Sequence, residues 1–244
     1  MKMGFDCATP LTADLAKRFK TGGYDFVGRY LVPGGWKALT AAEVKTIGDA
    51  GLGIISVFET TADRALGGYE AGKRDGAIAV QVAAQVGQPD GSCIYFAVDF
   101  DATSAQMATV IDYIRGASEA TPNHTTGVYG SYDVIVAVRN AAVCSRFWQT
   151  YAWSGGRRAD LLDIYQYKND VQVNGIGIDF NSVFTDAGAW TLVKEEEEHM
   201  MKVEDANKVI AFLSAAYAAT DSEEARAEFH RLANELRKVS GQTL

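Results

Sequence analysis

Short apolar runs alternate with amphipathic stretches along the first 190 residues of the chain. Runs rich in β-branched and aromatic residues predict eight strands, at residues 3–6, 25–31, 53–59, 93–98, 126–130, 147–153, 162–167 and 176–181. Helical spacing predicts about five helices between them, at residues 12–17, 40–49, 68–86, 104–117 and 132–140. This alternation predicts a TIM-like β/α barrel rather than an open doubly wound sheet. Only short connections follow residue 140, so we expect the late crossovers to lack full helices.

The pattern changes near residue 193, which we expect to end the barrel domain, residues 1–193. The sequence predicts an acidic linker at residues 194–201 and a helical hairpin at residues 202–244. The hairpin's apolar positions recur every three or four residues, at Val203, Ala206, Ile210, Leu213 and Tyr217 and then at Phe229, Leu232, Leu236 and Val239. Thr220 is the expected cap of the second helix. Such a hairpin is too small to bury its apolar seam alone. It should therefore pack on the barrel, pair with a second copy in a homo-oligomer, or bind the cell wall.

Composition narrows the classes of function. With 48% hydrophobic residues the chain can build a large core, and its net charge of -8 argues against nucleic acid as a partner. Cys7, Cys93 and Cys144 lack clustered spacing and are expected to be reduced thiols. The N-terminus lacks the apolar segment of a signal peptide, and no apolar run is long enough to cross a bilayer. We therefore expect no export signal and no membrane insertion.

Acidic side chains gather where the predicted strands end. Asp99 and Asp101 follow the apolar run 93–98, and in an extended strand they would project from the same face, with Cα atoms about 7 Å apart. Other polar and aromatic residues stand at or just past strand ends: Asp6, Glu59, Trp153, Gln166 and Asp179. A β/α barrel gathers its site at this end. We therefore expect these side chains to converge.

Converging carboxylates with Trp, Tyr and Gln, and without lysine or histidine, suit glycoside cleavage, in which one acid donates a proton and another group stabilises positive charge on the sugar. Two alternatives remain: the acids cap helices, or they bind Mg²⁺ or Ca²⁺. The three histidines lack zinc-ligand spacing, and no serine or cysteine has an obvious histidine base. The leading expectation is an enzyme without metal or cofactor.

Six ordered motifs resemble the glycoside hydrolase family 25 superfamily. They are GFD at 4–6, YFAVDFD at 95–101, GVYG at 127–130, WQTYAW at 148–153, IYQY at 164–167 and IDFN at 178–181. More narrowly, they resemble its glycoside-hydrolase-like branch of unknown function, found in bacterial and phage wall-lytic proteins. The resemblance covers about residues 3–192. It implies a β/α barrel that cleaves the sugar chain of peptidoglycan.

The resemblance also implies roles for individual residues. The family's central strand ends in Asp-x-Glu, whose glutamate donates the proton, and this chain has Asp99 and Asp101 at those positions. Asp101 thus stands at the donor position one methylene shorter, Glu59 is the alternative donor, and Asp99 is expected to be the electrostatic partner or base. Asp6 and Asp179 would flank the pair. The expected sugar-binding residues are Tyr30, Tyr129, Trp153 and Gln166.

The sequence therefore predicts a muramidase-like enzyme whose partner is bacterial peptidoglycan. The competing interpretation, motivated by aspartate at the donor position, is a wall-glycan binding module on the same barrel. A wall-lytic protein made without a signal peptide would act on the wall as a phage endolysin or as the product of a prophage gene.

Overall fold

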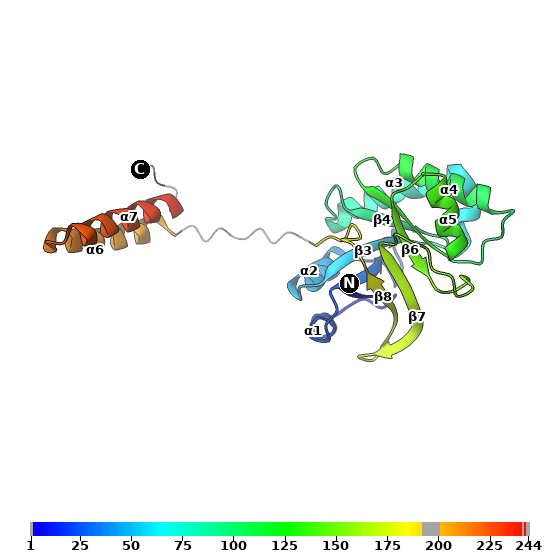
Figure 1. The fold of residues 1–244 in the computed structure, drawn as a ribbon, viewed down its shortest axis with the longest axis horizontal. Coiled ribbons are helices and arrows are strands. Elements are labelled where there is room, and N and C mark those ends of the chain that lie inside the picture. The colour runs from blue at the N-terminus through cyan, green and yellow to red at the C-terminus, as the bar shows by residue number, and fades with distance from the viewer. Residues whose placement is uncertain (1, 192–200, 241, 243–244) are drawn as a thin grey trace. The chain divides into compact units, whose positions relative to one another are not determined.

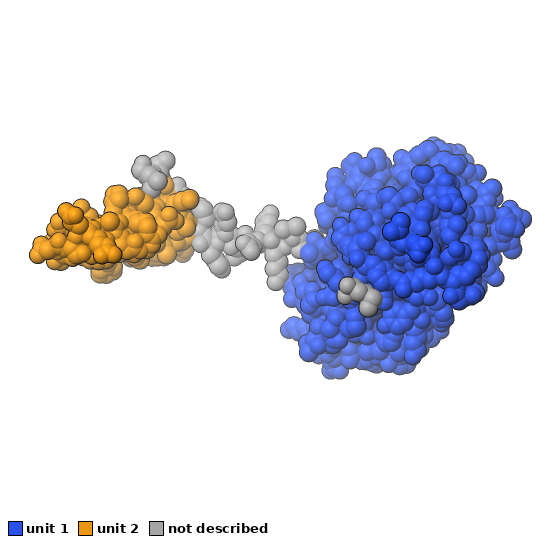
Figure 2. Space-filling view, in the orientation of Figure 1, with its two compact units in different colours: residues 1–192 blue, residues 193–244 orange. Residues whose placement is uncertain are grey.

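The structure is a computed structural model that describes residues 2–191, 201–240 and 242. It contains two compact units, residues 1–192 and 193–244, which Figure 2 colours separately. In the first unit the strands close into a barrel in the order β1-β2-β3-β4-β5-β6-β7-β8 (Figure 1). The predicted fold, a β/α barrel with C-terminal helices, is confirmed.

The strands of the barrel are short and follow chain order. They are β1 (Lys2–Asp6), β2 (Phe26–Tyr30), β3 (Gly53–Phe58), β4 (Cys93–Ala97), β5 (Thr125–Gly130), β6 (Arg146–Thr150), β7 (Ile164–Val173) and β8 (Ile176–Val183). The helical segments between them are α1 (Ala13–Thr21), α2 (Ala41–Asp49), the 3₁₀ turn η1 (Arg64–Gly67), α3 (Gly68–Val86), α4 (Met107–Glu119) and α5 (Tyr132–Asn140). No helix is assigned between β6 and β7 or between β7 and β8, as the short connections predicted.

Two apolar layers build the barrel unit. Buried side chains such as Phe19, Ile47 and Ile114 fill the space between strands and helices. A second cluster, including Tyr95 and Trp148, fills the barrel interior. The interior is therefore packed, as in other β/α barrels, and a site can form only at one of its ends.

The direction of β8 corrects one prediction. Strands β1 to β7 pair in parallel, but β8 is antiparallel to both β7 and β1. Asp179 consequently lies inside β8 rather than at a strand end, and it pairs with Asp6 across the β1–β8 ladder. Gln166 likewise lies within β7. Both reach the site because β7 and β8 form one long hairpin, with a two-residue turn at Asn174 and Gly175, which both have positive φ.

Threonine side chains cap the first two helices. The Thr12 and Thr40 hydroxyls accept hydrogen bonds from the backbone N–H groups of Leu15 and Glu43. The Glu43 carboxylate, however, turns inward to Arg29 instead of back to the start of α2, so only one of the two hydrogen bonds of a Thr40–Glu43 capping box forms. A buried guanidinium is the stronger partner, because an unpaired buried charge is costly.

The second unit is a helical hairpin of α6 (Val203–Ala219) and α7 (Glu223–Val239). Ala206, Ile210 and Ala233 are its buried side chains within these helices. Ser222, not Thr220, caps α7, because its hydroxyl stands next to the first helical residue and accepts from the Ala225 N–H. The predicted linker 194–201 lies outside the described residues, except for Met201. Among the described residues, no helix is long and apolar enough to cross a membrane.

Candidate active site

A cavity of about 210 Å³ opens at the barrel end where β1 ends, and every strand contributes to its wall directly or through the loop that follows. Its lining residues are Asp6, Tyr30, Val57, Glu59, Asp99, Tyr129, Trp148, Trp153, Gln166, Asn169 and Asp179. The structure thus brings together every candidate residue that the sequence indicated except Asp101. The position at this barrel end is the one at which β/α barrels gather catalytic groups.

Asp6 and Asp179 form a pair of carboxyl groups bridged by one amide. Gln166 Nε2 donates to Asp6 Oδ2 at 3.0 Å and to Asp179 Oδ2 at 3.3 Å. Burial, followed by repulsion from Asp179, raises the pKa of Asp6 to about 7, against the hydrogen bonds from Asn181 and Gln166. Burial also raises the pKa of Asp179. The pair therefore holds a proton to higher pH than ordinary carboxyl groups do, because two adjacent carboxylates removed from water cannot both ionise cheaply.

Both amides beside this pair are held in one orientation. Tyr129 Oη donates to Gln166 Oε1 at 2.9 Å, and Trp148 Nε1 donates to Asn181 Oδ1 at 2.9 Å. Because each amide oxygen already accepts, each amide nitrogen faces the carboxyl group, and Asn181 Nδ2 reaches Asp6 Oδ2 at 2.7 Å. These aromatic donors thus fix the geometry around Asp6.

Gly28 makes room for this arrangement. It pairs with Asp6 across the β1–β2 ladder. A Cβ atom at Gly28 would lie 2.7 Å from Asp6 Cβ and 2.7 Å from Trp148 Cη2. Only glycine therefore lets the Asp6 and Trp148 side chains share the barrel interior at this level.

Asp99 lies just past the end of β4, and its backbone N–H donates to the Ala62 carbonyl at 3.3 Å. Its side chain is half-buried, and among the described residues no side chain or backbone group makes a hydrogen bond to its carboxyl group. Burial, followed by repulsion from Glu59, raises the pKa of Asp99 to about 6, while Lys37 opposes the shift. Asp99 is thus a cavity acid that is free to bond to a ligand.

Glu59 has a different environment, because Lys37 Nζ lies 2.9 Å from its Oε1. The same ammonium group lies 4.0 Å from the centroid of the Tyr30 ring, over its face. Burial and the nearby Glu59 carboxylate raise the pKa of Tyr30. Lys37 therefore links two walls of the cavity through an ion pair and a cation–π contact.

The buried side chain of Arg29 holds two backbone segments near the cavity, the loop after β1 and the segment that carries Lys37. The Arg29 guanidinium binds both carboxylate oxygens of Glu43, with Nε 2.7 Å from Oε1. It also donates to the carbonyls of Cys7 and Ala8, which follow Asp6, and to the carbonyl of Lys37. One side chain therefore joins the loop after β1 to the segment that carries Lys37.

Asp101 does not project beside Asp99 as the sequence predicted. Strand β4 ends at Ala97 and the chain bends at Phe100, so the alternation of an extended strand stops before the second acid. Asp101 is exposed and lies outside the lining of the cavity. The prediction of a shared face was wrong because it carried the extended strand four residues past its end at Ala97, as far as Asp101.

Sequence reasoning missed Lys37, Trp148, Asn169 and Asn181. Trp148 and Asn181 do lie inside motifs used for the family resemblance, so their place in the site could have been inferred from those motifs. Lys37 follows a Pro-Gly-Gly turn and carries no such signal. Among the expected sugar-binding residues, Trp153 is 41% exposed and has a φ of 53°, which places it at the rim of the cavity.

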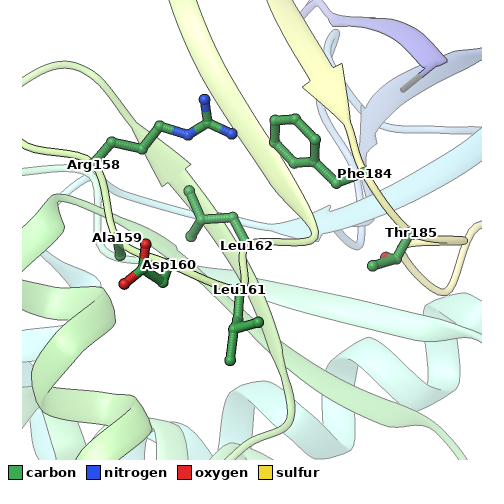
Figure 3. A pocket seen from close by; sticks show the side chains of 7 residues that line it. All are labelled: Arg158, Ala159, Asp160, Leu161, Leu162, Phe184 and Thr185. Carbon is green, nitrogen blue, oxygen red and sulfur yellow. The ribbon is translucent and has the colours of Figure 1, made fainter.

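A second cavity, of about 590 Å³, lies at the opposite end of the barrel, where β7 begins and β8 ends. Figure 3 shows its lining, which runs from Arg158 to Leu162 and includes Phe184 and Thr185. Asp160 is its one carboxylate, so it lacks the paired acids of the first cavity. Across the described part of the chain, no three His, Cys, Asp or Glu side chains are arranged to hold a metal ion.

Comparison with known proteins places the chain in a family. Residues 17–183 match the family described as the Rv2525c-like, glycoside hydrolase-like domain. YbfG of Bacillus subtilis is 33% identical over 163 residues, which are 57% of this chain and 21% of YbfG. This chain therefore spans only about a fifth of that relative's length.

Two solved structures share the fold. The Tat-secreted protein Rv2525c of Mycobacterium tuberculosis has a TM-score of 0.69 at 24% identity, covering 78% of this chain and 99% of that one. A glycosyl hydrolase 25 of Streptococcus pneumoniae has a TM-score of 0.52 at 11% identity, covering 77% of this chain and 89% of that one. The resemblance inferred from the six motifs is confirmed. Since the family match covers more than half of the chain, the protein belongs to the Rv2525c-like, glycoside hydrolase-like domain family.

Proposed function

We propose that the barrel is a glycosidase that cleaves the sugar chain of bacterial peptidoglycan, with Asp99 as its proton donor. One observation carries the proposal: the carboxyl group of Asp99 lines the cavity, has a pKa raised to about 6, and is free of hydrogen bonds among the described residues. A general acid needs a pKa near the working pH and an unobstructed path to the leaving oxygen. Asp99 meets both requirements.

The other candidate donors fit less well. Asp101 is exposed and lies outside the lining of the cavity. Glu59 is engaged with the Lys37 ammonium at 2.9 Å. Asp6 accepts hydrogen bonds from two amides, which hold its carboxyl group in place. The donor role expected for Asp101 or Glu59 therefore passes to Asp99.

Asp6 and Asp179 suit the second role in glycoside cleavage. Their pair lies beside Asp99 in the same cavity, where partial burial screens charge less than bulk water does. Such charge stabilises the oxocarbenium-like transition state. The exposed ring of Trp153 at the rim supplies a flat surface on which a sugar ring can pack.

Release of reducing ends from purified peptidoglycan tests this function. The full chain should produce new reducing ends, and Asp99→Asn should lower the rate by roughly 10²- to 10⁴-fold, the usual contribution of a positioned general acid. Cosedimentation with the same cell walls measures binding separately. Walls that bind the protein but yield no reducing ends would contradict the enzymatic proposal.

The second candidate function is a wall-glycan binding module, and it would explain that outcome. It is favoured by the position of Asp101, which stands where the resembling lysozymes carry their donor glutamate but lies outside the cavity. In either case we place the action of the protein at the bacterial cell wall, as for an endolysin of a phage or prophage.

For the C-terminal hairpin we propose association with a second copy of this chain. From Val209 to Ala219, α6 carries no charged residue, and Phe212 is 77% exposed on it. Ala206 and Ile210 are buried within the hairpin, so the Phe212 face remains to be covered. Phe212→Ser should reduce the mass of the full chain measured by light scattering, whereas Ala227→Ser on exposed α7 should not. A monomeric parent protein that pellets with walls through the hairpin would favour the wall-targeting alternative.

A further inference from the structure

The loop-like middle of β7 turns one amide side chain into the cavity. Between Lys168, which pairs with Phe180, and Val171, which pairs with Ile178, two β7 residues stand opposite the single residue Asp179. This is a β-bulge, a feature that re-aims side chains and often lies next to active sites. Asp170 has a φ of 57°, and its N–H donates to Asp179 Oδ1 at 2.8 Å. The bulge therefore anchors itself on a cavity carboxylate.

Asn169 is the other residue of the bulge, and it lines the cavity. Its Oδ1 atom is buried and lacks a hydrogen-bond partner among the described residues. The two other amides of the site differ, because Gln166 and Asn181 each use both their oxygen and their nitrogen in hydrogen bonds. Buried polar atoms in folded proteins are nearly always paired, so an unpaired one in a cavity calls for a ligand donor.

A side-chain amide presents an acceptor and a donor in one plane. The complementary group is another amide, whose N–H meets Oδ1 and whose carbonyl meets Nδ2. The carboxylates of Asp6, Asp99 and Asp179 offer acceptors for the hydroxyl groups of a sugar, but they do not provide this two-point match. On a sugar, the group with this chemistry is an acetamido substituent.

We propose that Asn169 recognises the acetamido group of an N-acetylated amino sugar, an inference that rests on the proposed glycan substrate. Asn169 is thus a specificity-determining residue, placed by the β7 bulge. A site built to pair with a substrate amide discriminates strongly against sugars that lack it, because its own polar atoms are then left unpaired.

Binding of two trisaccharides tests this role. The probes are tri-N-acetylchitotriose, which carries acetamido groups, and cellotriose, which carries hydroxyl groups instead. Each is titrated by NMR into the full chain bearing Asp99→Asn, which removes turnover. Asn169→Ala should weaken binding of the N-acetylated trisaccharide by about 10- to 100-fold, the range for loss of a buried hydrogen-bond pair. Asn169→Ala should change the binding of cellotriose by less than about twofold. Gln172→Ala, at an exposed position of β7, should change the binding of the N-acetylated trisaccharide by less than about twofold.

Thermal stability separates recognition from a structural role. Because Asn169 Oδ1 makes no hydrogen bond in the described protein, Asn169→Ala should leave the melting temperature unchanged or raise it. The inference is overturned if the parent binds both trisaccharides equally, or if Asn169→Ala leaves binding of the N-acetylated one intact. It is also overturned if the variant melts earlier and loses both ligands alike. These tests measure binding and not release of reducing ends. A protein that binds acetamido groups through Asn169 but cleaves no peptidoglycan would therefore contradict the proposed enzymatic function and leave this inference standing.

Discussion

Lys37 and Glu59 exert opposite effects on the proton of Asp99, and the resulting prediction is specific in sign. At pH 7, a pKa of about 6 leaves roughly a tenth of the Asp99 groups protonated. The Lys37 charge favours the ionised form, so Lys37→Met should raise the pKa of Asp99, and the unpaired Glu59 carboxylate adds to the rise. Glu59→Gln should lower it, because Lys37 is then unopposed.

The size of the shift follows from partial exposure. A charge near a carboxyl group moves its pKa by about one to three units, and solvent screening at the half-buried Asp99 favours the lower end. A shift of about one unit makes about half of the Asp99 groups protonated at pH 7 in Lys37→Met, roughly a fivefold gain. In Glu59→Gln the same shift leaves about one per cent, roughly a tenfold loss. The double variant should return close to the parent.

The assay is the pH dependence of reducing-end release, supported by NMR titration of the Asp99 carboxyl carbon. If Asp99 acts as the acid, activity falls as the pH rises through its pKa, and this alkaline limb should move up in Lys37→Met and down in Glu59→Gln. The reasoning would be refuted if the alkaline limb moved in the same direction in Lys37→Met and Glu59→Gln, or if it moved in neither variant. The NMR titration keeps the test valid where a variant loses activity.

Three further predictions concern the framework of the site. Gly28→Ala should lower the free energy of unfolding by about 1–3 kcal/mol in urea denaturation, because its Cβ would lie 2.7 Å from both Asp6 Cβ and Trp148 Cη2. The control Gly34→Ala, with no atom within 4 Å of the new Cβ, should lower it far less. Arg29→Met should lower the free energy of unfolding by about 3–5 kcal/mol, because it leaves the buried Glu43 carboxylate without its partner. An equal loss in Lys45→Met, which breaks an exposed ion pair with Asp49, would contradict this reasoning. Because the pKa of Asp6 is raised to about 7, its folded form binds a proton more tightly than the unfolded chain does, so stability from this group is present at acid pH and is lost as pH rises to 7. Asp6→Asn should flatten that decline in urea titrations between pH 4 and pH 8, and an unchanged slope would count against the raised pKa.

Local patterns predicted the barrel well where each element is set by its own residues. Helix α3 begins and ends at the predicted residues 68 and 86, because an alanine-rich run is closed by Gly87, which has a φ of 78°. Strands β1 to β6 were found because buried parallel strands are short apolar runs. Their ends then placed Asp6, Glu59 and Asp99 at one end of the barrel.

Long-range pairing was beyond local patterns. The residues around Asp179 carry no local pattern that predicts the antiparallel direction of β8. That direction places Asp179 opposite Asp6. The bend at Phe100 depends on packing past the end of β4, so the spacing of Asp99 and Asp101 alone predicted the wrong face. The β7 bulge that turns Asn169 into the cavity depends on register with β8.

The most direct measurement compares Asp99→Asn with Asp101→Asn in the rate of reducing-end release from purified peptidoglycan. Both changes replace a carboxylate by an amide of the same shape, and only Asp99 lines the cavity. We expect Asp99→Asn to lose roughly 10²- to 10⁴-fold in rate, while Asp101→Asn stays within about twofold of the parent. A large loss in Asp101→Asn together with an active Asp99→Asn would contradict the assignment of Asp99 as the proton donor.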